Sequence, residues 1–137
     1  MSLLERAGFT HVHAQPSPVG EVITGSATTG GKIVLTADLQ AAAKGAHLLY
    51  TDVWVSMGKE AEAAERIKVL AGYQINEALV RRAQPGALVM HCLPAYRGKE
   101  ITEETLEAHA ETIFREAENR LHMQKAILAT LAESARR

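Results

Sequence analysis

The chain has 137 residues, of which 47% are hydrophobic, and this length suits the core of one ordinary domain. Fifteen lysines and arginines against sixteen acidic residues leave a formal net charge of -1, which excludes a general attraction to nucleic acid or anionic membranes. A single cysteine excludes an internal disulfide and a multi-cysteine zinc site.

No apolar run approaches the ~20 residues that span a bilayer, and the start MSLLERAGF lacks the apolar core of a signal peptide. Together with the lone thiol, these features predict one cytoplasmic domain, residues 1–137, without a metal or another cofactor. Any bound anion must then be held by local contacts.

Short β-rich segments alternate with longer amphipathic ones, which is typical of an α/β domain whose helices flank a sheet. We predict a three-layer, Rossmann-like domain with a mostly parallel sheet of about four to five strands. The clearest strand candidates are THVHA (10–14), KIVLT (32–36), HLLYTDVWV (47–55) and ALVMHCL (87–93), with ETIFRE (111–116) as a weaker fifth.

The predicted helices lie between and after these strands. DLQAAAKGA (38–46) begins with a possible N-cap aspartate, and NEALVRRAQPG (76–86) and TEETLEAHA (102–110) begin with asparagine and threonine. KEAEAAERIKVLAGY (59–73) has charge opposite an apolar face. In the last helix, residues 117–137, an apolar stripe is expected to pack across the body of the domain; it comprises Leu121, Ala126, Ile127 or Leu128, and Leu131.

Residues 15–31 contain two prolines and four glycines, so we predict a loop there. The preceding SLLERAGF resembles the end of a helix that leads into the first strand. We therefore expect the start of the βα domain to be missing.

The third predicted strand ends at Asp52, which Ser56 and Met57 follow, and parallel α/β sheets bind ligands beyond the carboxyl ends of their strands. A carboxylate can hold an ammonium group, while a hydroxyl or backbone N–H group receives a carboxylate, and this combination suits an amino acid. In the alternative interpretation, Asp52 caps a turn and Met57 fills the core. The spacing alone leaves both interpretations open.

Cys92 ends another predicted strand, so it should open onto the same edge as Asp52. A thiol titrates near ~8.5, and a nearby cation can lower this pKa enough for a nucleophile or proton relay. Alternatively, Cys92 is buried core, because free cysteine is among the most buried residue types. His91 should point to the opposite face of the strand and makes a poor catalytic partner.

Arg120 lies near the start of the last predicted helix, where its guanidinium could hold a phosphate or a polarised carbonyl oxygen. The alternative is an ordinary ion pair with Glu116 or Glu118. The sequence contains no Gly-rich P-loop and no GxSxG, and its six histidines have no consistent ligand spacing except in HVH (11–13), which alone is a weak signal.

Three stretches together, TDVWVSMG (51–58), MHCLPAYRG (90–98) and EAENRLHMQKA (116–126), closely resemble the carboxyl-terminal, ornithine-binding domain of ornithine carbamoyltransferases. The resemblance runs from about residue 29 to residue 134. The HCLP stretch argues against the sister aspartate carbamoyltransferases, which carry a histidine followed by Pro-Leu-Pro there. The family transfers a carbamoyl group from carbamoyl phosphate to the δ-amine of ornithine, giving citrulline and phosphate.

The resemblance implies a role for each matching site residue. Asp52, Ser56 and Met57 would hold the backbone groups of ornithine, and Cys92 and Leu93 would border its side chain and the carbamoyl group. Arg120 would contact carbamoyl phosphate. Positioning and oxyanion stabilisation would suffice without a covalent intermediate, so Cys92 becomes a polar wall and proton relay.

The sequence departs from the family in ways that predict a fragment. The amino-terminal domain, with its Ser-x-Arg-Thr and His-Pro-x-Gln segments, is not in these residues, nor is the opening strand with its ornithine-binding asparagine. Residues 17–28 look unlike the family's helix, and Tyr96 stands where many members have histidine. The family forms trimers largely through its other domain, which leaves two partners open here, a second copy of the chain in a homo-oligomer or the missing amino-terminal half.

We therefore expect a carboxyl-terminal fragment of an ornithine carbamoyltransferase of arginine biosynthesis or catabolism, inactive alone and completed by the missing amino-terminal half. Its ligands would be L-ornithine and carbamoyl phosphate. Two alternatives are a non-catalytic remnant or interaction module that kept the fold, and a free-standing thiol enzyme built on Cys92.

Overall fold

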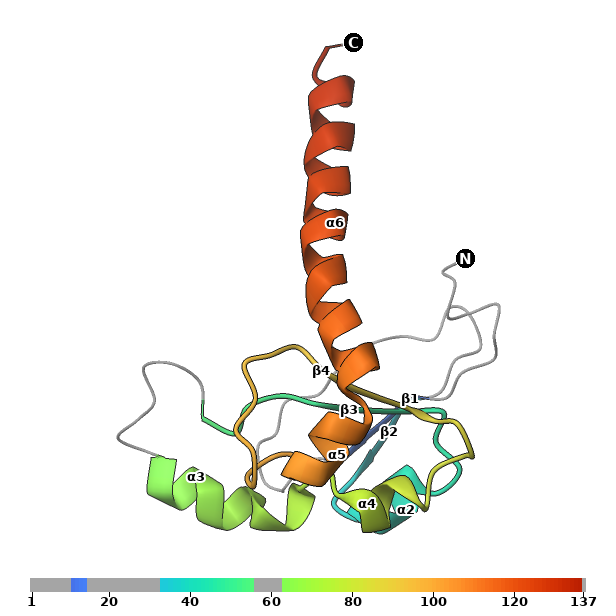
Figure 1. Cartoon of the computed structure of the whole chain (residues 1–137), viewed down its shortest axis with the longest axis vertical. Coiled ribbons are helices and arrows are strands. Elements are labelled where there is room, and N and C mark those ends of the chain that lie inside the picture. The colour runs from blue at the N-terminus through green and yellow to red at the C-terminus, as the bar shows by residue number, and fades with distance from the viewer. Residues whose placement is uncertain (1–10, 15–32, 56–62, 137) are drawn as a thin grey trace.

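The computed structural model describes residues 11–14, 33–55 and 63–136 of the chain (Figure 1). The predicted loop at 15–31 lies outside these residues. The described elements, in chain order, are β1 (His11–Ala14), β2 (Ile33–Thr36), α2 (Leu39–Ala43), β3 (Leu48–Thr51), α3 (Ala63–Leu70), the 3₁₀ turn η2 (Ala71–Tyr73), α4 (Glu77–Val80), β4 (Leu88–His91), α5 (Glu103–Ala108) and α6 (Ala110–Ser134).

The described strands form two parallel pairs, β1 with β2 and β3 with β4. In the second pair Leu48 stands opposite Leu88, and Thr51 stands opposite His91. The predicted α/β class and parallel strand direction are confirmed, and each of the four clearest strand candidates contains one of these strands. Because parallel strands need a crossover connection, α3, η2 and α4 lie between β3 and β4 in the chain.

Three helices begin at the predicted N-cap residues. The side chains of Asp38 in α2, Asn76 in α4 and Thr102 in α5 accept backbone N–H groups three residues later, at 3.0, 3.0 and 3.3 Å. Each cap satisfies an N–H group that has no partner within its helix, and such a cap is worth about 1 kcal/mol. The first two of these short helices, α2 and α4, lie side by side at the end of the body away from α6 (Figure 1).

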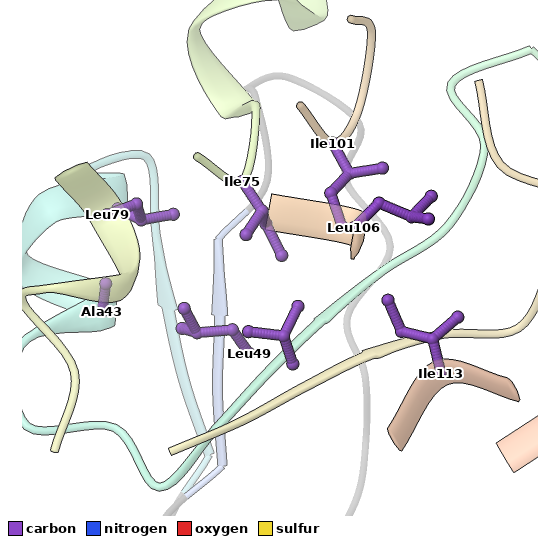
Figure 2. Packing of buried hydrophobic residues seen from close by; sticks show 8 residues of the cluster. Ala43, Leu49, Ile75, Leu79, Ile101, Leu106 and Ile113 are labelled. Atoms are coloured by element: carbon purple, nitrogen blue, oxygen red, sulfur yellow. The ribbon is translucent and has the colours of Figure 1, made fainter. Parts of the chain in front are cut away.

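The core lies on one face of the β3–β4 pair. Leu49 and Val89 are register partners and both are buried, whereas Leu48, Tyr50 and Leu88 alternate with them and are about half exposed. Residues of α2, α4, α5 and α6, together with the bridged pair Ile75 and Ile101, complete the core (Figure 2). Its buried members are Ala43, Leu49, Ile75, Leu79, Val89, Ile101, Leu106 and Ile113.

The prediction of a fifth strand over residues 111–116 is wrong. Residues 110–134 form one continuous helix of 25 residues, so ETIFRE makes the first turns of α6. Ile113 is fully buried beside the core, while Phe114 next to it is exposed. No glycine or proline interrupts this segment, and the helix-forming residues that follow continue the same helix.

The prediction that the last helix packs across the body is also wrong for the described structure. Figure 1 shows α6 projecting from the body, and every residue from 118 to 136 is exposed. The stripe residues Leu121, Ile127, Leu128 and Leu131 are 51 to 67% exposed. At 1.5 Å per residue the helix extends well past the body, so only its first turns reach the core. Among the described residues no helix combines the length and apolar composition needed to cross a membrane.

Candidate functional site

The site forms where β3 and β4 end. Thr51 and His91 stand opposite each other in the parallel register, so the residues that follow them, Asp52 and Cys92, leave the sheet at the same edge. The Cys92 thiol donates a hydrogen bond to Oδ1 of Asp52 at 3.1 Å. The predicted common edge is therefore confirmed, although 40 residues separate the pair.

The environment of Cys92 keeps its thiol protonated. Burial raises its pKa first, and the hydrogen bond to Asp52 and the negative charge of that carboxylate raise it further. A thiolate nucleophile needs the opposite, a neighbouring cation that lowers the pKa. This geometry disfavours a thiol enzyme and suits a neutral S–H group that donates to Asp52.

Tyr50 and Glu116 lie next to Cys92 as well, and neither was predicted from the sequence as a site residue. Although the Tyr50 side chain is about half exposed, partial desolvation of its phenol, a side-chain hydrogen bond with Glu116 and the proximity of Cys92 raise its pKa above the ordinary value. Tyr50 lies on the strand that leads to Asp52, and Glu116 lies on α6. The EAENR stretch carried the only signal for Glu116, because it places that residue one helical turn before Arg120.

Arg120 joins the site from α6. Its Nη1 donates a hydrogen bond to the carbonyl oxygen of Cys92 at 2.9 Å. The prediction that Arg120 lies near a helix start is wrong, because α6 begins at Ala110. The helix dipole acts within the first turn, so the charge at this position comes from the guanidinium alone.

Leu93 follows Cys92 in an unusual backbone conformation. Its φ is +54°, in the left-handed region that bulky side chains rarely adopt, and a cis peptide bond joins it to Pro94. The side chain is half-buried and packs against the core. The other two predicted ligand contacts, Ser56 and Met57, lie outside the described residues.

A buried polar pair lies beneath the turn that follows Cys92. His91 and Glu100 are both 0% exposed, and His91 Nε2 lies 3.1 Å from Glu100 Oε1. The prediction that His91 faces away from Cys92 is confirmed by its burial in the core. Glu100 could not be identified from the sequence, since nothing in its spacing distinguishes it from a surface glutamate.

Comparison with known proteins identifies the family. A family profile described as "Aspartate/ornithine carbamoyltransferase, Asp/Orn binding domain" matches residues 2–131. The chain belongs to this family. It is 51% identical over 120 residues to the ornithine carbamoyltransferase of Thermosynechococcus vestitus, a match that covers 85% of this chain and 39% of that protein.

Solved structures of carbamoyltransferases have the same fold. The anabolic ornithine carbamoyltransferase of Campylobacter jejuni superposes with a TM-score of 0.84 at 38% identity, over 95% of this chain and 45% of that one. The ornithine carbamoyltransferase of Pyrococcus furiosus gives a TM-score of 0.78 at 43% identity, over 91% and 42%. This carbamoyltransferase domain thus spans less than half the length of the relatives it matches.

Proposed function

We propose that the chain is the ornithine-binding half of an ornithine carbamoyltransferase, which converts carbamoyl phosphate and L-ornithine to L-citrulline and phosphate. One observation carries the proposal: Asp52 follows β3, Cys92 follows β4 and Arg120 lies on α6, and they meet at one sheet edge through contacts of 3.1 and 2.9 Å. That edge is where parallel α/β sheets bind ligands, and the chain belongs to a family of carbamoyltransferases.

In this proposal Asp52 holds the amino-acid end of ornithine, together with Ser56 and Met57. An ionised carboxylate pairs with the α-ammonium group, and the hydroxyl and backbone N–H groups suit the α-carboxylate. The side chain of ornithine then extends along Cys92 and Leu93 toward Arg120. This direction places its δ-amine beside Cys92 and Arg120.

The δ-amine must lose a proton before it can attack the carbonyl carbon of carbamoyl phosphate. The Cys92 thiol donates to Asp52, so its sulfur lone pairs can accept a hydrogen bond from the amine. As the amine loses its proton, the sulfur can pass that proton on to the departing phosphate group, so Asp52 stays ionised and keeps its pair with the α-ammonium group. Cys92 acts as a relay and a polar wall without forming a covalent bond.

Arg120 supplies positive charge where the carbonyl oxygen becomes negative. One guanidinium nitrogen of Arg120 donates a hydrogen bond to the Cys92 carbonyl oxygen, and this bond holds the forked guanidinium group beside the ornithine side chain. The other N–H groups of the fork suit an oxyanion or a phosphate oxygen. Most of the rate enhancement would come from placing two substrates in contact, with charge stabilisation at the oxyanion.

The other half of the carbamoyl phosphate site must come from a second polypeptide or a longer form of the chain. The 137 residues contain no Ser-x-Arg-Thr segment, and the chain covers 39% of its relative from Thermosynechococcus. We therefore propose that the isolated chain binds L-ornithine and produces no citrulline above background. The complete enzyme would act in arginine biosynthesis or catabolism in the cytoplasm.

Calorimetric titration of the purified chain with millimolar L-ornithine tests this proposal. Saturable heat and a thermal shift, both lost in Asp52→Asn, are the expected results. Asp38→Asn is a matched control, because asparagine caps a helix as well as aspartate does and Asp38 caps α2. If the parent chain gives no heat and no thermal shift, the proposal is wrong and the chain is a remnant that kept only the fold.

A further inference from the structure

The buried pair of His91 and Glu100 holds the turn that carries Cys92 and Leu93. The Leu93 N–H donates to His91 Nδ1 at 2.9 Å, and the Tyr96 N–H donates to Glu100 Oε1 at 2.6 Å. The imidazole connects these two anchors, since its Nε2 lies 3.1 Å from the same Oε1. Both ends of the 93–96 turn are therefore tied to one pair of side chains.

These contacts determine the state of the imidazole. Because the Leu93 N–H is a donor, Nδ1 must be the unprotonated nitrogen, and Nε2 carries the hydrogen that it donates to Glu100. Burial would raise the pKa of Glu100, but the hydrogen bonds from His91 and from the Tyr96 N–H outweigh it and lower that pKa. The pair is a neutral ring bonded to a carboxylate.

Leu93 needs such support. A bulky residue in the left-handed region, here at φ +54°, is strained and persists only where surrounding contacts compensate. The hydrogen bond from its N–H to a fully buried ring is such a contact. Because Cys92 is the residue directly before Leu93, a change in this backbone would move the thiol relative to Asp52.

We propose that His91 and Glu100 are positioning residues for the ornithine site: by anchoring the N–H groups of Leu93 and Tyr96, they hold Cys92 against Asp52. This inference rests on the proposed function. In this role His91 stays buried in the core and does not contact the ligand. Its Nδ1 is the atom that matters most, because it accepts the hydrogen bond from the Leu93 N–H.

Two substitutions at His91 separate the roles of its two nitrogens. In His91→Asn the side-chain oxygen lies where Nδ1 lies and still accepts from Leu93, while the contact with Glu100 is lost. In His91→Gln the longer amide reaches toward Glu100 and no acceptor remains beside Leu93. Both variants bury one amide, so thermal denaturation provides the check that their stabilities match.

Alkylation of Cys92, the only cysteine, by iodoacetamide reports on its contact with Asp52 without any ligand. His91→Asn should keep the parent's pH profile and its ornithine affinity within about threefold. His91→Gln should alkylate faster at neutral pH, because the thiol pKa falls when Asp52 moves away, and should bind ornithine about tenfold or more weakly. Equal behaviour of the two variants at matched stability would overturn the inference.

If His91→Gln does not fold, Glu100→Gln and Glu100→Met give the same test at the other anchor. Glutamine keeps an oxygen acceptor for the Tyr96 N–H, whereas methionine keeps the volume without it, so only Glu100→Met should change the alkylation profile. Identical profiles would refute the positioning role. Should the parent chain fail to bind ornithine while these profiles differ, the proposed function fails and the anchoring of Cys92 stands.

Discussion

Cys92 Sγ lies 3.1 Å from Asp52 Oδ1, so a thiol and a carboxylate 40 residues apart share one hydrogen bond at the edge of a parallel strand pair. A thiol beside a carboxylate is a weak nucleophile and a usable hydrogen-bond donor. The contact therefore favours a substrate-binding role for Cys92 over covalent catalysis.

We expect Cys92 to react slowly with iodoacetamide at neutral pH. Burial and the hydrogen bond to Asp52 raise its pKa, so the thiolate fraction increases only at more alkaline pH than for a free thiol. In Asp52→Asn the negative charge is gone, so the alkylation rate at neutral pH should rise. A parent chain that alkylates as fast as free cysteine would contradict this environment.

The same raised pKa predicts how stability depends on pH. The folded chain holds the Cys92 proton more tightly than the unfolded chain, so this contribution is fully present below the ordinary thiol pKa. It is lost as pH rises through the raised pKa. When the pH is raised from neutral to alkaline, urea denaturation should show a smaller loss of stability in Cys92→Ser than in the parent. Equal losses in the two proteins would contradict the raised pKa of Cys92.

Arg120→Gln should weaken binding of the carbamoyl phosphate group while leaving ornithine binding nearly unchanged. Ornithine affinity should stay within about threefold of the parent, because the guanidinium is assigned to carbamoyl phosphate. A bisubstrate analogue that joins ornithine to a carbamoyl phosphate mimic should bind about 10- to 100-fold more weakly, since a charged hydrogen-bonding group is lost. Arg115→Gln is the matched control on the same helix, where Arg115 pairs with Glu111. Calorimetry measures both ligands, and equal losses in the two variants would argue against the assignment.

Two leucine substitutions test which apolar residues stabilise the fold. Leu79 is 2% exposed in the core, so Leu79→Ala should lower the free energy of unfolding by about 2–5 kcal/mol. Leu128 is 67% exposed on α6, so Leu128→Ala should change it by less than about 0.5 kcal/mol. Urea denaturation measures both. A loss above about 1 kcal/mol in Leu128→Ala would show that the stripe packs against another surface in solution.

Local features of this chain could be predicted because they depend on neighbouring residues. Asp38, Asn76 and Thr102 cap the helices at the predicted positions, since a cap needs only its own first turn. Asp52 and Cys92 could be assigned to one sheet edge, because carboxyl ends of parallel strands meet there. Their actual contact depends on the register between β3 and β4.

The predictions that failed concern α6, where local patterns admit more than one structure. The short run ETIFRE suits a strand or a helix, and the continuation of the helix through residues 110–134 decides between them. An apolar stripe indicates which face of a helix can be buried, but not whether this chain supplies the surface that buries it. The described residues beyond 117 remain exposed.

By itself the sequence determined the α/β class, three helix starts and the strand ends that bring Asp52 and Cys92 to one edge, because periodicity, capping and strand ends are encoded within a few neighbouring residues. Only the tertiary structure decided which polar groups meet. The Asp52–Cys92 contact, the reach of Arg120 to the Cys92 carbonyl and the buried His91–Glu100 pair all join separate segments. Such contacts depend on strand register and helix direction in three dimensions, which spacing along the chain does not specify.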